Sequence, residues 1–367
     1  MKWKHWLRYP LDRRVATKAL RRVSVPVEYP RPAIGFDLKQ DHLLVDGARH
    51  LACLAILADR VSHEVVLRCS PVLLAAIAHK RLGALFLSLT NVSWIAASKP
   101  FSNVSVALTD HDETDRRSDA SVRRVRMLIG KEAFAGAKVL PYPMHPKQML
   151  AWNDSLAEHL RETPKAGIFF AGNQKSRYGR STMRDRFGVL PRLELVATLE
   201  RHFAERIEPR HAEGNPERIV LRDSNQHPVA GDQWMQTLAE HRFFLCCPGV
   251  AQPMCHNVIE SMACGVIPLI EYGDRFEAPL RDGVNAICFD GRDGLVDAVR
   301  RIDQLSPLQL NQMSQAAAYY YDRHLRGDLV LRNVLNDDSC ERLSLPFHES
   351  NLFQAGAIIS HRLRLAS

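Results

Sequence analysis

Three polar residues at helical spacing, His256, Asn257 and Glu260, are the strongest candidates for chemistry in this sequence. They lie three or four positions apart, so on a helix they share one face. The apolar stretch Phe243–Cys247 precedes them and a second one, Val266–Ile270, follows. A helix between two buried strands begins at the sheet edge where open α/β proteins bind ligands. Its first N–H groups suit a diphosphate, and a carboxylate there suits the two hydroxyls of a ribose.

A basic loop supplies the cations that a phosphorylated ligand would need. It follows the apolar stretch Gly167–Phe170, and its candidate residues are Asn173, Lys175, Arg177 and Arg180. Guanidinium groups bind phosphate oxygens in pairs, and positive charge would stabilise a departing nucleotide. The alternative for such a run is a solvated surface loop. The alternative for Glu260 is to cap its helix or to pair with Arg281.

Proton transfer would need a base, and the candidates are His111, Asp112 and Asp46. The first two follow the predicted strand Val104–Thr109, and Asp46 follows a short predicted strand, His42–Val45. Each could remove a proton from a hydroxyl group. Asp110-His111-Asp112 also mimics a metal-binding Asp-x-Asp motif. The pattern of strands and helices in this domain does not suit the fold of the enzymes that use this motif, so we expect no metal. A solvated acidic turn is the structural alternative.

Apolar strands and amphipathic helices alternate along the chain, which predicts parallel sheets with helical crossovers, an α/β fold. In the first half we predict the strands His42–Val45, Glu64–Cys69, Leu85–Leu89 and Val104–Thr109, and the helices Gly47–Val61 and Pro71–Lys80. In the second half we predict the strands Gly167–Phe170, Phe243–Cys247, Val266–Ile270 and Ala286–Phe289, and the helices Pro191–Phe203, Trp234–His241, Leu295–Leu305 and Pro307 to about His324.

The proline-rich segment Lys138–Pro146 separates the two halves. We therefore predict a basic extension over residues 1–34, a Rossmann-like domain over 35–146, a second one over 147–330, and a C-terminal segment over 331–367 that packs back on the first domain. Two domains of this kind form a cleft, and ligands usually bind in such clefts.

Composition excludes several classes of protein. The 367 residues carry a net charge of +8, and no apolar run approaches the roughly 20 residues that cross a bilayer. The N-terminus lacks a secretory signal, so we expect a cytoplasmic protein. Residues 1–9 place aromatics among cations, which suits either a membrane surface or a basic arm. We expect no nucleic-acid partner, because no basic stripe with aromatics follows them.

Fingerprints for cofactors and metals are absent from the sequence. There is no G-x-G-x-x-G and no Walker motif, which disfavours simple dehydrogenases and P-loop enzymes. The eight cysteines contain no CxxC pair, and the spacing of Cys246, Cys255 and Cys264 with His256 matches no common zinc site. We therefore expect no cofactor and no metal. No lysine follows Lys175, so any later cation that binds a phosphate must be Arg or His.

Residues 166–325 resemble the nucleotide-sugar domain of GT-B glycosyltransferases, including the retaining and the exostosin-like enzymes. Ile259–Ile270, IESMACGVIPLI, is similar to their E-(A/S)-M-A-x-G-x-(I/V)-P core. The preceding FFLCCPG resembles their F-x-L-x-P-G strand and turn, and Ile168–Gly172, IFFAG, resembles the first strand of that domain. In residues 1–150 only the α/β rhythm agrees.

The resemblance implies two Rossmann-like domains that face each other across a cleft. It also implies that Glu260 holds the donor ribose and that Gly249 lets the backbone approach the donor. Many relatives have a glutamate eight positions before Glu260, where this chain has Gln252. An amide still binds sugar hydroxyls but supplies no charge, which fits an exostosin-like enzyme better than a retaining one. His145-Pro146 and His227-Pro228 mimic a dipeptide that holds CMP donors in bacterial sialyltransferases, a weaker resemblance.

The implied function is transfer of a sugar from a nucleotide-sugar donor to a glycan or lipid-linked acceptor, in the synthesis of surface polysaccharides or glycoconjugates. The basic N-terminus suits an enzyme at the inner membrane face. The alternative is a catalytically silent nucleotide- or sugar-binding protein on the same fold. The sequence leaves open the nucleotide, the sugar and the anomeric outcome.

Overall fold

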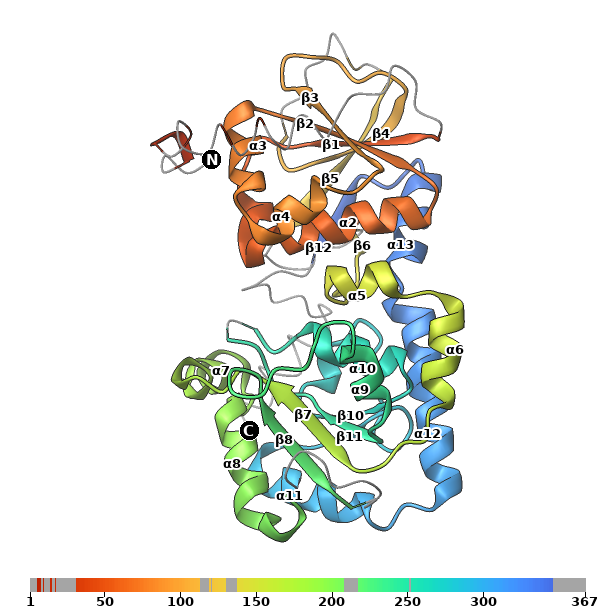
Figure 1. Cartoon of the computed structure of the whole chain (residues 1–367). Helices are drawn as coiled ribbons and strands as arrows, with labels where there is room; N and C mark the ends of the chain where they lie inside the picture. The colour runs from red at the N-terminus through yellow and green to blue at the C-terminus, as the bar shows by residue number, and fades with distance from the viewer. Residues whose placement is uncertain are drawn as a thin grey trace, which may run out of the picture. The chain divides into compact units, whose positions relative to one another are not determined.

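The computed structural model of this chain describes residues 31–112, 119, 121–129, 137–207, 217–250 and 252–345, together with 5–7, 9, 14 and 17. It divides into two compact units (Figure 1). Unit 1 takes the described residues up to Pro141 and resumes at Gly327, and unit 2 runs from Tyr142 to Arg326. Most of the predicted extension 1–34, including most of residues 1–9, and the part of segment 331–367 beyond Leu345 lie outside the described residues.

Unit 1 is built on a parallel sheet. Its strands are β1 (Ala33–Asp37), β2 (Glu64–Cys69), β3 (Val92–Ala96), β4 (Val104–Thr109), β5 (Arg123–Ile129), β6 (Lys138–Val139) and β12 (Arg342–Leu345). Within the described ranges they lie in the order β3-β2-β1-β4-β5-β12-β6, and every pair is parallel. Because the strand order reverses between β1 and β4, the ligand crevice of such a sheet lies outside their carboxyl ends.

Helical segments cover this sheet. They are the 3-10 helix η1 (His42–Ala48) and the helices α2 (Arg49–Arg60), α3 (Pro71–Ala78), α4 (Arg81–Phe86) and α13 (Gly327–Asn336). Helix α2 contacts η1, α4 and α13, so the chain's return at Gly327 completes one helical layer. The other face of the sheet packs against Phe101, which meets Ala33, Val66 and Ala107.

Two predicted strands of unit 1 are wrong. The segment His42–Val45 is part of η1, and the first strand is Ala33–Asp37. The segment Leu85–Leu89 begins in α4, and the strand follows at β3. Leu82 and Phe86 are both buried and lie four residues apart, which is helical spacing. Short apolar runs do not distinguish a strand from a helix, and both errors have this cause.

Unit 2 is built on a second parallel sheet. Its strands are β7 (Ile168–Gly172), β8 (Ile219–Asp223), β9 (Phe243–Leu245), β10 (Ile267–Ile270) and β11 (Ile287–Cys288). Its helices are α5 (Pro146–Ala151), α6 (Asp154–Glu162), α7 (Thr182–Phe187), α8 (Arg192–His202), α9 (Trp234–Ala239), α10 (His256–Ala263), α11 (Gly291–Ile302) and α12 (Pro307–Tyr320). Its 3-10 segments are η2 (Ser176–Gly179), η3 (Ala204–Arg206) and η4 (Gly273–Arg275), and the π-helical η5 is Tyr321–Leu325.

The strands of unit 2 follow the order β11-β10-β9-β7-β8 in the part of the chain that is described, and all pairs are parallel. The order reverses between β7 and β9, which is the doubly wound arrangement of flavodoxin-like folds. Helices α8 and α11 pack together on one face, where Leu195 and Leu295 join the core (Figure 1). On the other face Phe169 packs against Phe244 and Trp234. The predicted α/β class with two parallel sheets is confirmed, and the cleft stays a prediction.

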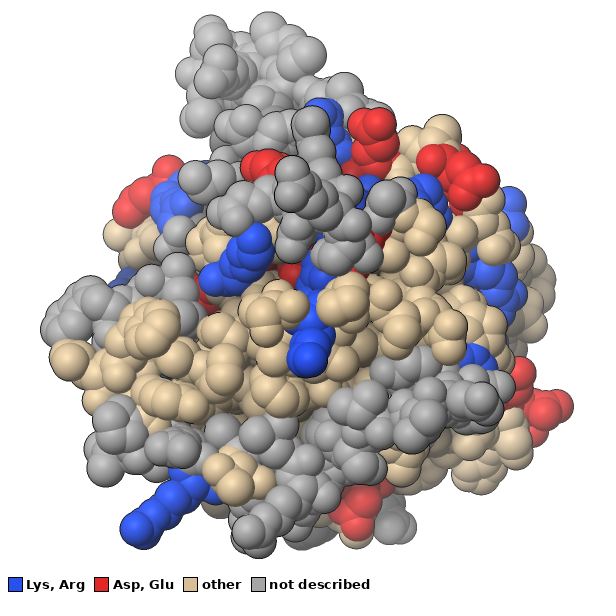
Figure 2. Space-filling view, turned by 90° about the horizontal axis from the view of Figure 1, so that it is seen from above, with Lys and Arg blue, Asp and Glu red and all other residues tan. Residues whose placement is uncertain are grey.

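Surface character adds little to this picture. Figure 2 shows one face of the molecule, on which basic and acidic side chains are scattered among other residues. In the described segments, no helix has both the length and the apolar character needed to span a bilayer.

Candidate functional site

In unit 2 the loop after β7 and the turn after β9 meet the first turn of α10 at the point where the strand order reverses. Asn257, in that turn, donates from Nδ2 to the Ala171 carbonyl of β7 at 3.3 Å. Its Oδ1 is buried and has no hydrogen-bond partner among the described residues. Gly249 closes the β9 turn by donating from its N–H to the Gln252 carbonyl at 3.0 Å. The structure thus brings α10, Gly249 and the start of the basic loop together at the carboxyl ends of β7 and β9.

Glu260 is fully buried and serves the interior of unit 2. Its Oε1 accepts a hydrogen bond from the His145 backbone N–H at 2.8 Å, and its Oε2 accepts one from Trp234 Nε1 at 2.6 Å. Buried carboxylates require such donors, because leaving them unsatisfied is costly. Each carboxylate oxygen can accept a second hydrogen bond, but a ribose would have to reach a side chain that is fully buried, so the predicted ribose contact stays a prediction.

The bond to Glu260 also brings an unexpected histidine to this edge. His145 and His256 lie with their ring centroids 5.7 Å apart, and both side chains are half-buried. His145 caps α5, accepting from the Lys147 N–H at 3.3 Å through Nδ1. Sequence reasoning named His145 only as part of a His-Pro dipeptide. Its pairing with His256 links positions 111 residues apart, which no local pattern predicts.

Arg192, at the start of α8, connects the loop after β7 to the turn after β9. Its Nη1 donates to the Asn173 carbonyl and its Nη2 to the Pro248 carbonyl, both at 2.9 Å. The guanidinium lies 3.9 Å from the centre of the Tyr178 ring. The side chain is 8% exposed, and its Nε has no hydrogen-bond partner in the described structure. The sequence analysis missed this residue, although an arginine at a helix start after a basic loop was visible.

The remaining predicted residues of the basic loop face solvent. Lys175, Arg177 and Arg180 have exposed side chains. Asn173 holds the loop, because its Oδ1 accepts from the Lys175 N–H at 3.0 Å and its Nδ2 donates to Asn225. Gln252 is buried. The loop therefore presents three exposed cations on a turn that Asn173 stabilises. Such cations can bind an anion that arrives from solvent.

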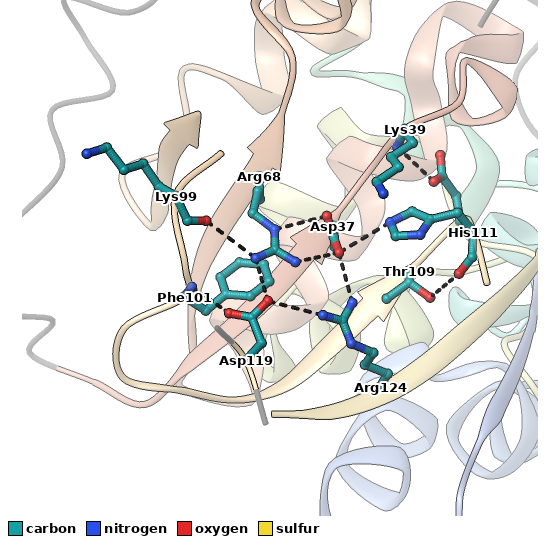
Figure 3. Close-up of polar contacts among 10 residues, drawn as sticks. Asp37, Lys39, Arg68, Lys99, Phe101, Thr109, His111, Asp119 and Arg124 are labelled. Atoms are coloured by element: carbon teal, nitrogen blue, oxygen red, sulfur yellow. Dashed lines mark hydrogen bonds and ion pairs between the residues drawn. The ribbon is translucent and has the colours of Figure 1, made fainter. Parts of the chain in front are cut away.

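Unit 1 holds a buried ionic network at the carboxyl ends of its central strands (Figure 3). Arg68 donates from Nε and Nη2 to the two oxygens of Asp37 at 3.0 and 2.6 Å, and from Nη1 to Asp119 at 2.5 Å. Arg124 reaches the same two carboxylates at 3.0 and 3.1 Å. Two cations and two anions thus form a closed set that connects β1, β2 and β5.

His111 extends this network. Its Nε2 lies 3.2 Å from Asp37 Oδ2, and its ring is 7% exposed. Both ring nitrogens are buried, and neither makes a hydrogen bond of good geometry with a described residue, so the contact with Asp37 is one of distance and charge. Burial opposes ionisation of Asp37, but the nearby His111 ring and the hydrogen bonds from Arg68 outweigh it and hold the pKa of this carboxyl well below its usual value.

The other two base candidates have different surroundings. Asp112 is 89% exposed and pairs with Arg126 at 3.1 Å. Asp46 is half-exposed, pairs with Arg49 at 3.0 Å and lies within η1. Its predicted position at the end of the first strand is wrong, because Asp37 occupies that position. Sequence reasoning missed Asp37 because it placed the first strand nine residues too late.

Asp110 closes the loop after β1. Its two oxygens accept from the backbone N–H groups of Lys39 and Gln40, each at 2.9 Å. Burial raises the pKa of this carboxyl, although the two backbone bonds oppose the rise. In dinucleotide-binding folds the corresponding N–H groups bind phosphate. Here a carboxylate of the protein takes that place, so the loop after β1 does not suit an anion.

No protein-family model matches this chain, and comparison with curated proteins found no match. Solved structures with a similar fold include a glycosyltransferase from Rickettsia africae ESF-5, with a TM-score of 0.48 and 10% identity over 84% of this chain and 98% of that chain. Another is HepE from Anabaena in complex with UDP, with a TM-score of 0.42 and 12% identity over 83% of this chain and 98% of that chain. At such values neither alignment bears on the ligand or the reaction of this chain.

Proposed function

We propose that this chain is a glycosyltransferase that uses a nucleotide-sugar donor, with the donor bound by unit 2. One observation carries the proposal: the loop after β7, the turn after β9 and the start of α10 converge at the point where the strand order of unit 2 reverses. Ligands of doubly wound sheets bind at that point. The N–H groups at the start of α10 and the cations Lys175, Arg177 and Arg180 suit the diphosphate of such a donor.

The loops of the two units support different roles, donor binding for unit 2 and acceptor activation for unit 1. In unit 1 the N–H groups after β1 already bind Asp110, which supports a phosphate site in unit 2 rather than in unit 1. Unit 1 instead offers His111 beside an ionised Asp37, a pair that can remove a proton from a hydroxyl group. We therefore assign acceptor activation to His111 in preference to Asp112 or Asp46.

The finer parts of the proposal rest on the sequence resemblance. The acceptor would be a glycan or a lipid-linked saccharide of a surface polysaccharide or glycoconjugate, handled at the inner membrane face. The proposal uses protein cations rather than a metal to neutralise the diphosphate, so a chelator should leave transfer unchanged.

A thermal-shift screen against UDP, GDP, ADP and CMP, and against their sugars, tests the proposal first. A ligand that binds only the folded state raises its melting temperature, so the preferred nucleotide would be identified. Release of that nucleotide from its sugar, with transfer to an oligosaccharide acceptor, would then support the enzyme. Binding without turnover over a broad acceptor panel would favour the silent binding protein, and failure to bind any of these ligands would exclude both.

A further inference from the structure

Arg192 is a buried cation whose hydrogen bonds do not neutralise its charge. Both of its bonded acceptors are backbone carbonyls, of Asn173 and Pro248. No carboxylate lies within ion-pair distance of it in the described segments. Glu194, two residues on, pairs with Arg184 and Arg292 instead. Glu271 accepts from the backbone N–H groups of Leu190 and Gly291.

The position of Arg192 is as informative as its charge. Asn173 follows β7 and Pro248 follows β9, so one planar guanidinium fixes the spacing between the loops on either side of the switch point. Tyr178, whose ring the guanidinium contacts, belongs to the basic loop itself. A single side chain thus connects the basic loop to the β9 turn that contains Gly249.

A buried charge without a counter-ion is unfavourable, and an anion bound nearby relieves this cost. An anion that enters between these loops would meet the field of Arg192 from the interior and the exposed cations from solvent. Among the described residues, Arg192 Nε and Asn257 Oδ1 have no hydrogen-bond partner, so within that part of the chain the polar groups at this end of the strands are not fully satisfied. A neutral ligand would not neutralise the charge of Arg192 and so would not relieve this cost.

We propose that Arg192 is a positioning residue for a diphosphate group: it holds the loops after β7 and β9 at the spacing that the diphosphate needs and supplies a buried positive charge. This inference rests on the proposed function, because the diphosphate would belong to the nucleotide-sugar donor. Arg192 acts through the loops and its field, and so it should affect charged ligands far more than neutral ones.

Two substitutions separate the charge from the geometry. Arg192→Gln removes the charge, whereas Arg192→Lys keeps the charge but cannot bond two carbonyls with a planar fork. Isothermal titration would compare the preferred nucleoside diphosphate with its nucleoside, and inorganic pyrophosphate with both. We expect the Gln variant to lose at least about thirtyfold in diphosphate affinity, the Lys variant about fivefold, and the nucleoside affinity of both to stay within about twofold.

Arg206→Gln is the matched control. Arg206 also binds a carbonyl, that of Glu217, and it pairs with Asp303. It precedes β8, however, and so lies at the amino ends of the strands, opposite to the end where Arg192 lies. Its loss should leave diphosphate affinity within about twofold. If Arg192→Gln does not fold, as judged by circular dichroism, Arg192→Lys and Tyr178→Leu are judged by the same comparison of diphosphate with nucleoside.

The outcomes distinguish the two proposals. Selective loss of diphosphate affinity in the Arg192 variants supports the inference. Unchanged affinity, or an equal loss for diphosphate and nucleoside, overturns it and leaves the proposed function standing. A wild-type protein that binds neither a nucleoside diphosphate nor pyrophosphate removes both.

Discussion

At the scale of single residues, His111 lies beside a carboxylate, Asp37, whose position is fixed. Asp37 is held by two guanidinium groups and cannot turn away from the ring (Figure 3). The same carboxylate lies 3.2 Å from Nε2 and would stabilise an imidazolium if the ring took a proton. Asp112, one residue further along, is solvated and lacks this support.

This contrast predicts different kinetic effects at neighbouring positions. His111→Gln should lower the kcat of transfer by about 10²- to 10⁴-fold with little change in the KM for the donor, because only proton removal is lost. Asp112→Asn should change kcat by less than about threefold. Steady-state kinetics with the preferred donor measures both. The reverse ranking of the two variants would transfer the role of base to Asp112.

Asp37 should also make unit 1 sensitive to acid. Its folded pKa is depressed, so its stabilising contribution is fully present above its ordinary value of 3.8 and is lost as the pH falls below it. Asp37→Asn leaves Arg68 and Arg124 each with one anion fewer and should cost about 3–5 kcal/mol near neutral pH. Urea unfolding between pH 7 and pH 3 should show the difference from wild type shrinking in acid. A difference that is constant with pH would show that Asp37 is not ionised in the network.

Glu260 offers a test of its two roles. In Glu260→Gln one carboxylate oxygen becomes an NH₂ group, so either Trp234 Nε1 or the His145 N–H loses its acceptor. We expect a loss of about 1–3 kcal/mol in the free energy of unfolding. If Glu260 also binds the ribose, the variant should lose its preference for a ribonucleotide over the 2′,3′-dideoxy analogue. Retention of that preference would leave Glu260 with the interior role alone.

At the scale of elements, the turn after β9 depends on the absence of a side chain at Gly249. A Cβ there would lie 2.8 Å from the Gln252 carbonyl oxygen, closer than folded proteins allow, so the backbone would have to shift. Because the same turn carries the Pro248 carbonyl that Arg192 binds, the shift would also disturb the loop after β7, which Arg192 binds at Asn173.

Gly249→Ala should therefore cost about 1–3 kcal/mol in stability and weaken nucleotide binding at least about tenfold. Gly231→Ala is the control, since a Cβ at Gly231 meets nothing within 4 Å. Urea unfolding and titration with the preferred nucleotide measure the two effects. Equal behaviour of the two alanine variants would mean that the turn adjusts freely.

Elements with strong local patterns were predictable, and sites assembled over distance were not. Strands β2 and β4 have the predicted bounds, because each is an apolar run rich in Val between polar residues or turns. Strand β5 was missed because Arg123, Arg124 and Arg126 mask its alternation, although two of these arginines bind groups inside unit 1. The partners of Asp37 come from three other segments, 31 to 87 positions away, and the Glu260–His145 bond spans 115. No spacing rule reaches that far.

At the scale of the whole molecule, unit 1 is discontinuous in sequence. The chain leaves it at Pro141 and returns at Gly327, and β12 then lies between β5 and β6, with β12 paired to both. Helix α13 packs on α2, and Arg123 donates to the carbonyls of Val334, Leu335 and Cys340. The last described strand is therefore an internal part of the first sheet, whereas the described residues of unit 2 all lie between Tyr142 and Arg326.

Truncation after Arg326 should consequently affect the two units unequally. It removes α13 and β12, which leaves the β5 backbone unpaired on one side and exposes the apolar face of α2. We expect unit 1 to lose its cooperative unfolding transition, while nucleotide binding by unit 2 persists in a thermal-shift assay. Truncation after Leu345, which keeps β12, is the control and should preserve both transitions. Loss of nucleotide binding in the shorter chain would mean that unit 2 needs unit 1 in order to fold or to bind its ligand.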